Sequence, residues 1–455
     1  MEIDSHTPMI VSDNTRGSLF RREVFYVPLG ALLLMTLQFQ TTPAPFEVQI
    51  IPLTSLLALA FLPFIMFDIR RSPLLLVMGV FVGYVLIHSL VLLVIDLAAG
   101  EPALRFFSWL RQCAALIAGF SVFLLLRETT QHLTDRQITR YIVWGSLPAL
   151  LLAIVNILWG GLNQQWAGAV VTGVRSFVAP LGYTAPLRAS GFSQEPATFA
   201  AVIVIVLFPV LFYMYEVQYR MWKTILYFGV VVLAFVWTFS VVGVALFAAL
   251  VAVGILFGPR RKFFRRIGLA SLAVLVAGLF LIPSNQILRH GRSIVLGQSN
   301  VSFIDRYYGL IGPFLMSFQT YTVFGYGLGG TVSHFEDVLP KEVQAAVASV
   351  KWKELPNLST LIGRIYAETG ALGLAFFLGA LGMTFWEFRR AMNRAREPNR
   401  VAFLFAARLG FILACVASAM TLGSFHMPYL WLWMAIVDAR YLQSLNEDVP
   451  GETLS

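Results

Sequence analysis

Long runs of apolar residues, separated by short polar segments, are the main pattern along the chain. A run of this length can cross about 30 Å of hydrocarbon as an α-helix, and together the runs predict about twelve transmembrane helices. The predicted spans are residues 25–42, 48–67, 74–97, 105–126, 141–160, 197–215, 224–239, 241–257, 267–283, 360–385, 401–424 and 428–443. The pattern therefore predicts an all-α, polytopic membrane protein.

The apolar stretch 224–257 fits two short helices or one long helix. Thr238, Ser240 and Gly243 favour a turn between two helices, because these residue types are common where a helix ends and another begins. A single helix would place the long polar segment that follows on the opposite side of the membrane.

Two polar segments stand out against otherwise short connections, and both are expected on the same external side. The first, 161–196, is rich in Gly and Pro. The second, 284–357, is too long for a simple connection, and apolar residues at helical spacing predict a helical loop on the membrane surface. The resulting divisions are a tail 1–24, a bundle 25–283, the loop 284–357, C-terminal helices 358–445 and a tail 446–455.

Composition agrees with a membrane protein. Hydrophobic residues make up 58% of the chain and charged residues 13%, and the mean hydropathy is +0.75, far more apolar than a soluble domain. No small-residue cleavage site follows the first apolar run, so we expect it to be a retained anchor. Both cysteines, Cys113 and Cys415, fall inside apolar runs, which excludes a disulfide framework and a cysteine metal cluster.

The net charge of +9 would suit a nucleic-acid partner, but its distribution favours another explanation. With the N-terminus inside, most Lys and Arg residues fall in segments on one side of the predicted membrane, including 16–22, 260–266 and 389–400. Basic residues collect in this way in cytoplasmic segments. The pattern predicts two cytoplasmic termini, an external loop 284–357, the lipid bilayer as a partner and no nucleic acid.

The stretch 187–200, LRASGFSQEPATFA, joins a polar loop to a long apolar run and places Arg188 and Glu195 at the membrane surface. Pro196 suits the first turn of the following helix, since its missing N–H would be unpaired there anyway. Glu195 would then lie at the positive end of that helix. The alternative to a functional role is that Glu195 is only a helix-start residue and Arg188 a surface charge.

Further polar candidates lie on the predicted external side. Arg364 and Glu368 stand four residues apart in a predicted helix, and a structural ion pair is the favoured interpretation. The glycine-rich run 325–330 follows no strand and begins no βαβ unit, so it is not a nucleotide loop. Its predicted use is a tight backbone turn near a ligand.

The long loop holds three other candidates, Arg306, His334 and Asn357. Arg306 follows Asp305, so a surface charge or local pair is as good an interpretation as ligand binding. A single loop histidine is more often incidental than catalytic, and His334 as a functional group is the alternative.

Several classes of enzyme are excluded by missing motifs. The chain has no Asp-x-Asp for a metal-bound nucleotide sugar, no external Cys/His cluster with zinc spacing and no Gly-x-Ser-x-Gly elbow. What remains is a set of external arginines above a helical bundle. Guanidinium groups suit an anionic, lipid-linked substrate.

The stretch 187–200 contains a motif that resembles one in the bacterial polysaccharide polymerases of the Wzy type. Its residues, in order, are Arg188, Gly191, Phe192, Glu195 and Pro196. These polymerases are related to the O-antigen ligases. The later order also agrees, with Arg306 early in a long loop, then the run 324–329, and then 356–357 and 368–373. The resemblance covers about residues 185 to 385 and the general topology.

The resemblance implies a glycosyltransferase of the bacterial inner membrane that moves a glycan from an undecaprenyl diphosphate carrier at the periplasmic face, with no cofactor, metal or nucleotide. A polymerase would use a second lipid-linked repeat unit as acceptor, and a ligase would use lipid A–core. A chain-length regulator and a flippase would be its partners in making exopolysaccharide or O-antigen. A transporter of lipid-linked oligosaccharides is a further alternative.

Two departures from the family bear on this choice. First, the ligases resemble one another in having a histidine directly before an asparagine, whereas this chain has Pro356 before Asn357. Second, the turn of the short helix pair, Ser240 to Gly243, lacks the arginine that is often found there in the family. The first departure favours a polymerase and leaves His334 or Glu195 as the base. Arg188 and Arg306 are expected to converge on the diphosphate, within about 12 Å of each other.

Overall fold

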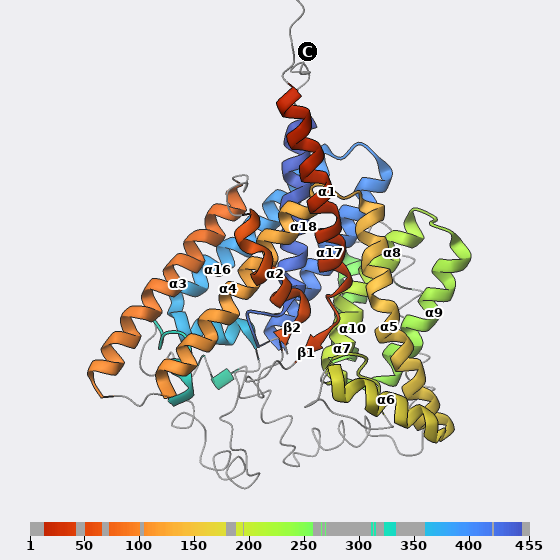
Figure 1. The fold of residues 1–455 in the computed structure, drawn as a ribbon, viewed down its shortest axis with the longest axis horizontal. Helices are drawn as coiled ribbons and strands as arrows, with labels where there is room; N and C mark the ends of the chain where they lie inside the picture. The colour runs from red at the N-terminus through yellow and green to blue at the C-terminus, as the bar shows by residue number, and fades with distance from the viewer. Residues whose placement is uncertain are drawn as a thin grey trace, which may run out of the picture.

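A computed structural model describes residues 13–41, 51–65, 72–100, 104–178, 188–193, 195–257, 323–333, 360–420 and 423–447, with 265, 269, 311, 312 and 314. The described part is almost entirely helical (Figure 1). It contains six helices that are long and apolar enough to cross a membrane, so the chain is a multi-pass membrane protein. The predicted helix 267–283, and almost all of the predicted helical loop 284–357, lie outside the described residues.

The first half of the bundle contains α1 (Asp13–Met35), α2 (Leu53–Ile65), α3 (Pro73–Ala98), α4 (Leu104–Thr130), α5 (Asp135–Leu162) and α6 (Gln165–Val178). The second half contains α7 (Pro196–Val202), the π-helix η1 (Ile203–Leu207), α8 (Phe208–Glu216), α9 (Met221–Trp237), α10 (Val241–Phe257), the 3-10 turn η2 (Gly330–Ser333), α16 (Leu361–Arg394), α17 (Pro398–Met420) and α18 (Pro428–Glu447).

The bundle has two distinct ends. At one end, α1 and α18 both reach the turn between α4 and α5, where Tyr26 stacks on His132 and Arg440 bonds to Asp135. We call this the basic end, because many of the chain's arginines lie there. At the other end, the lower one in Figure 1, lie α6, the start of α7 and the described segment 323–333. We call it the motif end.

The two predicted N-terminal spans differ from the observed elements. α1 begins at Asp13, inside the predicted tail 1–24, and ends at Met35. The predicted span 48–67 becomes the short strand β2 (Ile51–Pro52), paired with β1 (Gln40–Thr41), followed by the 13-residue helix α2. Proline explains the later helix start, because the residue before it is biased toward extended backbone. α2 is shorter than a full membrane span.

The two-helix interpretation of 224–257 is confirmed. α9 and α10 are separated by a turn in which Phe239 has a positive φ of 46°. Ser240 then caps α10 by accepting the backbone N–H of Gly243 at 3.1 Å, as expected of a helix N-cap. Gly243 has a packing role as well, since an added Cβ would lie 2.6 Å from the Cβ of Ala200 in α7.

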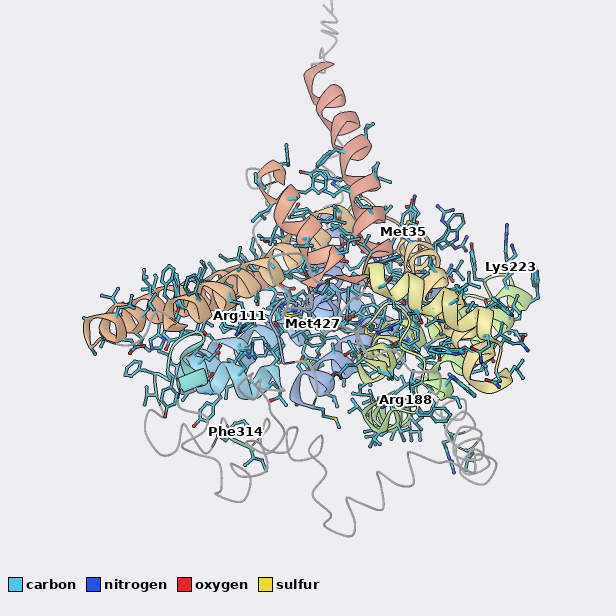
Figure 2. The ribbon with its side chains drawn as sticks, turned by 60° about the horizontal axis from the view of Figure 1, so that its bottom comes forward. Met35, Arg111, Arg188, Lys223, Phe314 and Met427 are labelled. Atoms are coloured by element: carbon cyan, nitrogen blue, oxygen red, sulfur yellow. The ribbon has the colours of Figure 1, made fainter. Side chains whose placement is uncertain are left out.

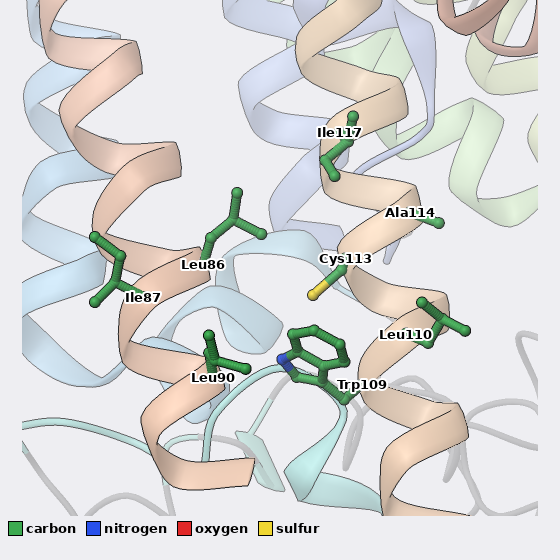
Figure 3. Close-up of a pocket in the computed structure, with 8 residues that line it drawn as sticks. All are labelled: Leu86, Ile87, Leu90, Trp109, Leu110, Cys113, Ala114 and Ile117. Atoms are coloured by element: carbon green, nitrogen blue, oxygen red, sulfur yellow. The ribbon is translucent and has the colours of Figure 1, made fainter. Parts of the chain in front are cut away.

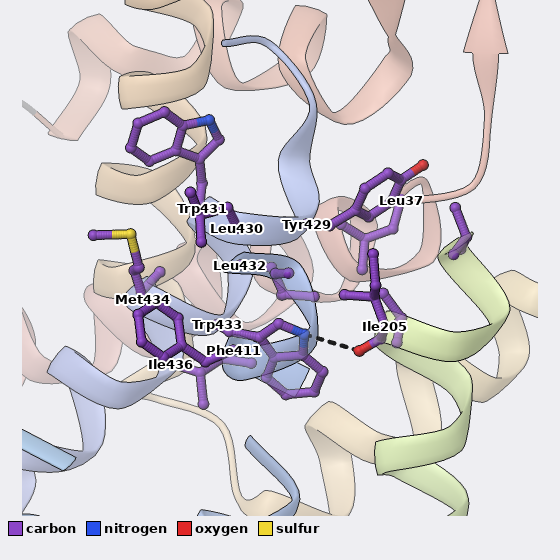
Figure 4. Packing of buried hydrophobic residues seen from close by; sticks show 14 of the residues in the cluster. Leu37, Ile205, Phe411, Tyr429, Leu430, Trp431, Leu432, Trp433, Met434 and Ile436 are labelled. Carbon is purple, nitrogen blue, oxygen red and sulfur yellow. Dashed lines mark hydrogen bonds between the residues drawn. The ribbon is translucent and has the colours of Figure 1, made fainter. Parts of the chain in front are cut away.

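The span that follows the motif is broken by a π-helix. Pro209 has no N–H to offer the carbonyl of Ile205, four residues earlier. The indole N–H of Trp433 in α18 donates to that carbonyl at 3.1 Å instead (Figure 4). The π-helix is therefore joined to the centre of the bundle by the hydrogen bond that the proline leaves open.

α18 is the central helix of the core. From Tyr429 to Val437 its residues are all buried, as expected for a helix that is apolar on every side. Glycines let its tryptophans approach neighbouring helices, because an added Cβ on Gly119 of α4 would lie 2.5 Å from Trp431 Nε1, and one on Gly410 of α17 would lie 2.2 Å from the Trp433 ring. Small residues at helix contacts are typical of membrane bundles.

Two arginines that the charge pattern assigns to the cytoplasmic surface are buried inside the basic end. Arg127 donates to Asp438 at 2.5 Å and also pairs with Glu128. Arg440 donates to the carbonyl oxygens of Thr130 and Leu133, both at 2.9 Å. These arginines join α18 to the end of α4 and to the turn that follows it.

Candidate functional site

The Glu195–Pro196 pair forms a helix start, as the sequence predicts. Pro196 is the first residue of α7, and Glu195 is its N-cap with extended backbone (φ −122°, ψ 147°). The Glu195 side chain makes no capping hydrogen bond and is exposed. It therefore presents a carboxylate to solvent at the positive end of α7.

The motif loop 188–193 is built around a buried arginine from another helix. Arg175 of α6 donates to Ser190 Oγ, and to the carbonyl oxygens of Gly191 and Ser193 at 3.1 Å each. Burial lowers the pKa of Arg175 to about 10, so the guanidinium is still charged at neutral pH. Arg175 thus holds three acceptors of the loop with one fixed cation.

Gly191 fits this loop for two reasons. Its backbone is left-handed, with φ 51°, a region that residues with a Cβ avoid. An added Cβ would also lie 2.7 Å from the ring of Phe199. The glycine of the motif is therefore explained by backbone conformation and by close packing against α7.

The predicted external loop 161–196 contains a helix, α6. α5 continues to Leu162, and residues 165–178 form an amphipathic helix. Ala167 and Val171 are buried, whereas Trp166 and Val170 are exposed. The spacing i, i+4 of the buried residues is a helical signal, and the prolines at 180 and 186 that suggested a loop come after the helix ends.

Arg188 attaches the loop to the turn between α9 and α10. Its Nε donates to the carbonyl of Thr238 at 3.0 Å, and the next residue, Ala189, donates its N–H to Trp237 O at 3.0 Å. Arg188 is half-buried. It is part of the loop's anchorage and not simply a surface charge.

A second group of candidate residues surrounds a break in α16. Gly370 has φ 68° and ψ −169°, so the helix is interrupted there. The carbonyls of Ala367 and Glu368 accept the backbone N–H groups of Tyr326 and Gly327 at 2.9 and 2.8 Å. The glycine-rich run thus satisfies backbone groups that the break leaves open, as polar groups inside a membrane require.

Gly325, Gly327 and Gly329 have φ values of 73°, 73° and 70°. The predicted tight turning of this run is therefore confirmed. Its partner in the structure is the broken helix: an added Cβ on Gly370 would lie 2.1 Å from Val323 O. Only glycine at these positions lets the two backbones meet.

Arg364 and Glu368 lie on the helical turns just before the break, and both are buried. Arg364 Nη1 donates to Gln112 Oε1 of α4 at 2.8 Å. Glu368 Oε1 accepts the N–H of Gly329 at 3.1 Å. Each charged side chain thus has a hydrogen-bond partner on a different element. The predicted ion pair between Arg364 and Glu368 is therefore only part of their role, because the two residues also join α16 to α4 and to the glycine-rich run.

Phe314 connects the long loop to this group. Its ring packs against Tyr366 of α16 with centroids 5.0 Å apart. Tyr366 lies between Arg364 and Glu368 in sequence. The long loop therefore reaches α16 at the level of the two charged side chains.

The two groups lie on opposite flanks of the motif end. In Figure 2, Arg188 of the motif loop and Arg111 of α4, the residue before Gln112, are on either side of Met427. The remaining predicted site residues, Arg306, His334 and Asn357, lie outside the described residues. The convergence of Arg188 and Arg306 thus stays a prediction.

An open apolar groove of about 430 Å³ lies between α3 and α4 near the second group (Figure 3). Leu86, Ile87 and Leu90 form one wall, and Trp109, Leu110 and Cys113 are on the other. The indole N–H of Trp109 donates to Ser89 Oγ at 3.2 Å. Among the described residues, no group of His, Cys, Asp or Glu is arranged to hold a metal ion.

A comparison of the chain with models of known protein families gave no match, and neither did a comparison with curated proteins.

Proposed function

We propose that the protein is a polymerase that joins undecaprenyl-diphosphate-linked oligosaccharide repeat units at the periplasmic face of the bacterial inner membrane, with both termini in the cytoplasm. The observation that carries this proposal is the motif loop. One buried arginine, Arg175, fixes the loop beside α7, and an exposed carboxylate, Glu195, stands at the start of that helix.

In the proposed reaction, a hydroxyl oxygen of the acceptor repeat unit attacks the anomeric carbon of the donor glycan. The bond between that carbon and the diphosphate oxygen breaks, and the proton of the hydroxyl passes to a base. Glu195 or His334 would be the base. The departing lipid diphosphate gains negative charge, which fixed guanidinium groups such as Arg188 and Arg306 would stabilise.

Transfer of the glycan to lipid A–core by a ligase is the second candidate, since the same residues would serve it. Pro356 before Asn357 is the sequence feature that argues against it. A transporter is the third candidate, and the break in α16 at Gly370 supports it, because transporters use broken helices around their substrates. In this chain, the glycine-rich run fills the break.

Reconstitution distinguishes the three candidates. The purified protein in vesicles is given only lipid-linked repeat units on the side that faces the motif end. We expect longer lipid-linked chains, and we expect Glu195→Gln and His334→Ala together to give none. Product that forms solely after addition of lipid A–core would make the protein a ligase. Movement of intact repeat units across the bilayer, with no new glycosidic bond, would make it a transporter.

A further inference from the structure

Arg111 is a charged residue in a membrane-spanning helix for which the motif resemblance provides no role. It lies seven residues after the start of α4, about two helical turns from the motif end. Its side chain is half-buried. Its Nε is covered by protein, and no acceptor lies within hydrogen-bond distance of it in the part of the chain that the structure describes.

The charged neighbour on the facing helix does not compensate Arg111. Arg364 of α16 interacts electrostatically with Arg111, which repels it, and with Glu368, which attracts it. Gln112, the residue after Arg111, has its amide oxygen bound to Arg364. Glu368 in turn accepts from the backbone of Gly329. Among these described side chains Glu368 is the one anion, and it faces two guanidinium groups.

The chain is closely packed near Arg111. Gly329 packs against the backbone of α4 one turn before Arg111, where an added Cβ would lie 2.7 Å from Ser108 O. The glycine-rich run, the start of α4 and the break in α16 therefore meet at this place. A guanidinium held in a rigid, partly dry environment binds an anion more strongly than one in water.

A charge without a partner in a membrane protein is costly, and such residues generally face a ligand pathway or the bilayer surface. Two arginines with one carboxylate leave an excess of positive charge at this place. An anion with oxygen acceptors would balance this charge.

We propose that Arg111 binds the phosphate or diphosphate headgroup of a membrane lipid, and that Arg364 is held beside it by Gln112 as a second positive charge. The proposal deepens the proposed function. It rests on that function only for the choice of a lipid diphosphate as the anion. Inorganic diphosphate offers the same oxygens without a lipid chain, so the two sources are separated by experiment.

The test measures binding of farnesyl diphosphate and of inorganic diphosphate to the purified full-length protein in detergent. The variant is Arg111→Met, which keeps the length of the side chain and removes the charge. The matched control is Arg408→Met, because Arg408 is also half-buried in a membrane-spanning helix, α17, and its guanidinium carbon lies 5.9 Å from the centroid of the Phe388 ring.

We expect Arg111→Met to weaken binding of farnesyl diphosphate about tenfold to a hundredfold, the scale of one charge-assisted hydrogen bond, and Arg408→Met to leave it unchanged. Equal affinity of the parent and Arg111→Met would overturn the proposal. Equal loss in both variants would show a general charge effect and would overturn it too. If the protein bound inorganic diphosphate but not farnesyl diphosphate, the ligand of Arg111 would be a soluble anion, and the lipid headgroup would be excluded.

A second measurement separates ligand binding from a structural role. An unpaired, half-buried charge destabilises the ligand-free protein, so Arg111→Met should raise its melting temperature. A lower melting temperature would show that Arg111 stabilises the fold, and would count against the proposal. Binding is measured without glycosyl transfer, so a protein that binds the lipid through Arg111 and makes no polymer would refute the polymerase and leave this inference standing.

Discussion

Arg188 donates its Nε–H to the backbone carbonyl of Thr238, 3.0 Å away and 50 positions further along the chain. This bond connects the motif loop to the turn between α9 and α10. That turn exists only because residues 221–257 form two helices and not one. The ambiguous part of the hydrophobic pattern is thus the part that receives the motif arginine.

Arg188→Lys should therefore affect stability as well as activity. Lysine keeps the charge but lacks an N–H at the Nε position, so we expect the free energy of unfolding to fall by about 1 kcal/mol. Polymer formation should slow about tenfold or more, since lysine also lacks the paired donors that grip a diphosphate. Thermal unfolding and product assays measure both effects. Arg140→Lys, an exposed change at the basic end, is the control, and a lysine variant equal to the parent in both assays would contradict this account.

Arg175→Gln should loosen the whole motif loop. The substitution removes the cation that serves Ser190, Gly191 and Ser193, and we expect a loss of about 2 kcal/mol or more in the free energy of unfolding. Thermal unfolding and protease sensitivity at 188–193 are the measurements. Ser176→Ala, at the next and exposed position, should change stability by less than about 0.5 kcal/mol. Similar effects of the two changes would show that the loop does not depend on Arg175.

Gly370→Ala should be one of the most damaging small substitutions in the chain. The backbone there is left-handed, and the new Cβ would meet Val323 O at 2.1 Å, so we expect a loss of more than about 3 kcal/mol. Gly382→Ala is the matched control in the same helix, because nothing lies within 4 Å of its added Cβ. It should be neutral or slightly stabilising. Comparable melting temperatures for both variants would argue against the observed contact between 323–330 and α16.

The orientation in the membrane can be tested with single cysteines at the two ends. In a background with Cys113 and Cys415 replaced, Ser176→Cys on α6 should react with an impermeant thiol reagent in intact spheroplasts, because the motif end is expected outside. Arg140→Cys at the basic end should react only after the membrane is opened. Both positions are exposed. The reverse labelling would invert the topology and place the motif loop in the cytoplasm.

The catalytic base can be assigned by comparing two variants. If His334 is the base, His334→Ala should abolish polymer formation at normal protein levels, and Glu195→Gln should retain part of it. If Glu195 is the base, the result is the reverse, because the exposed carboxylate is then the proton acceptor. The rate of polymer formation by the purified protein is the measurement. Full activity in both variants would exclude both residues from this role.

Much of the fold follows from the hydrophobic pattern. Apolar runs near the length of a bilayer predict helices, and every predicted span within the described residues contains a helix. Two of the differences occur where one residue overrides the pattern. Pro52 delays α2, and Gly370 breaks α16 inside an apolar run. Periodicity over a window averages over such single positions.

The candidate site was predictable only in part. The helix start at Glu195–Pro196 is local, so residue types reveal it. The partners of the motif are not local: Arg175 comes from a helix that composition obscured, and Thr238 lies beyond two helices. Arg111 carries no motif at all, and its environment became visible only with α16 beside α4.

The sequence by itself determined the class of protein and the helix start at Pro196, and it favoured the two-helix turn near Thr238, because these depend on the hydrophobicity and backbone preferences of neighbouring residues. Only the tertiary structure decided which polar groups share a partner. Hydrogen bonds join atoms that are close in space and distant in sequence, so Trp433 with Ile205, Arg364 with Gln112 and Arg188 with Thr238 required the packed bundle.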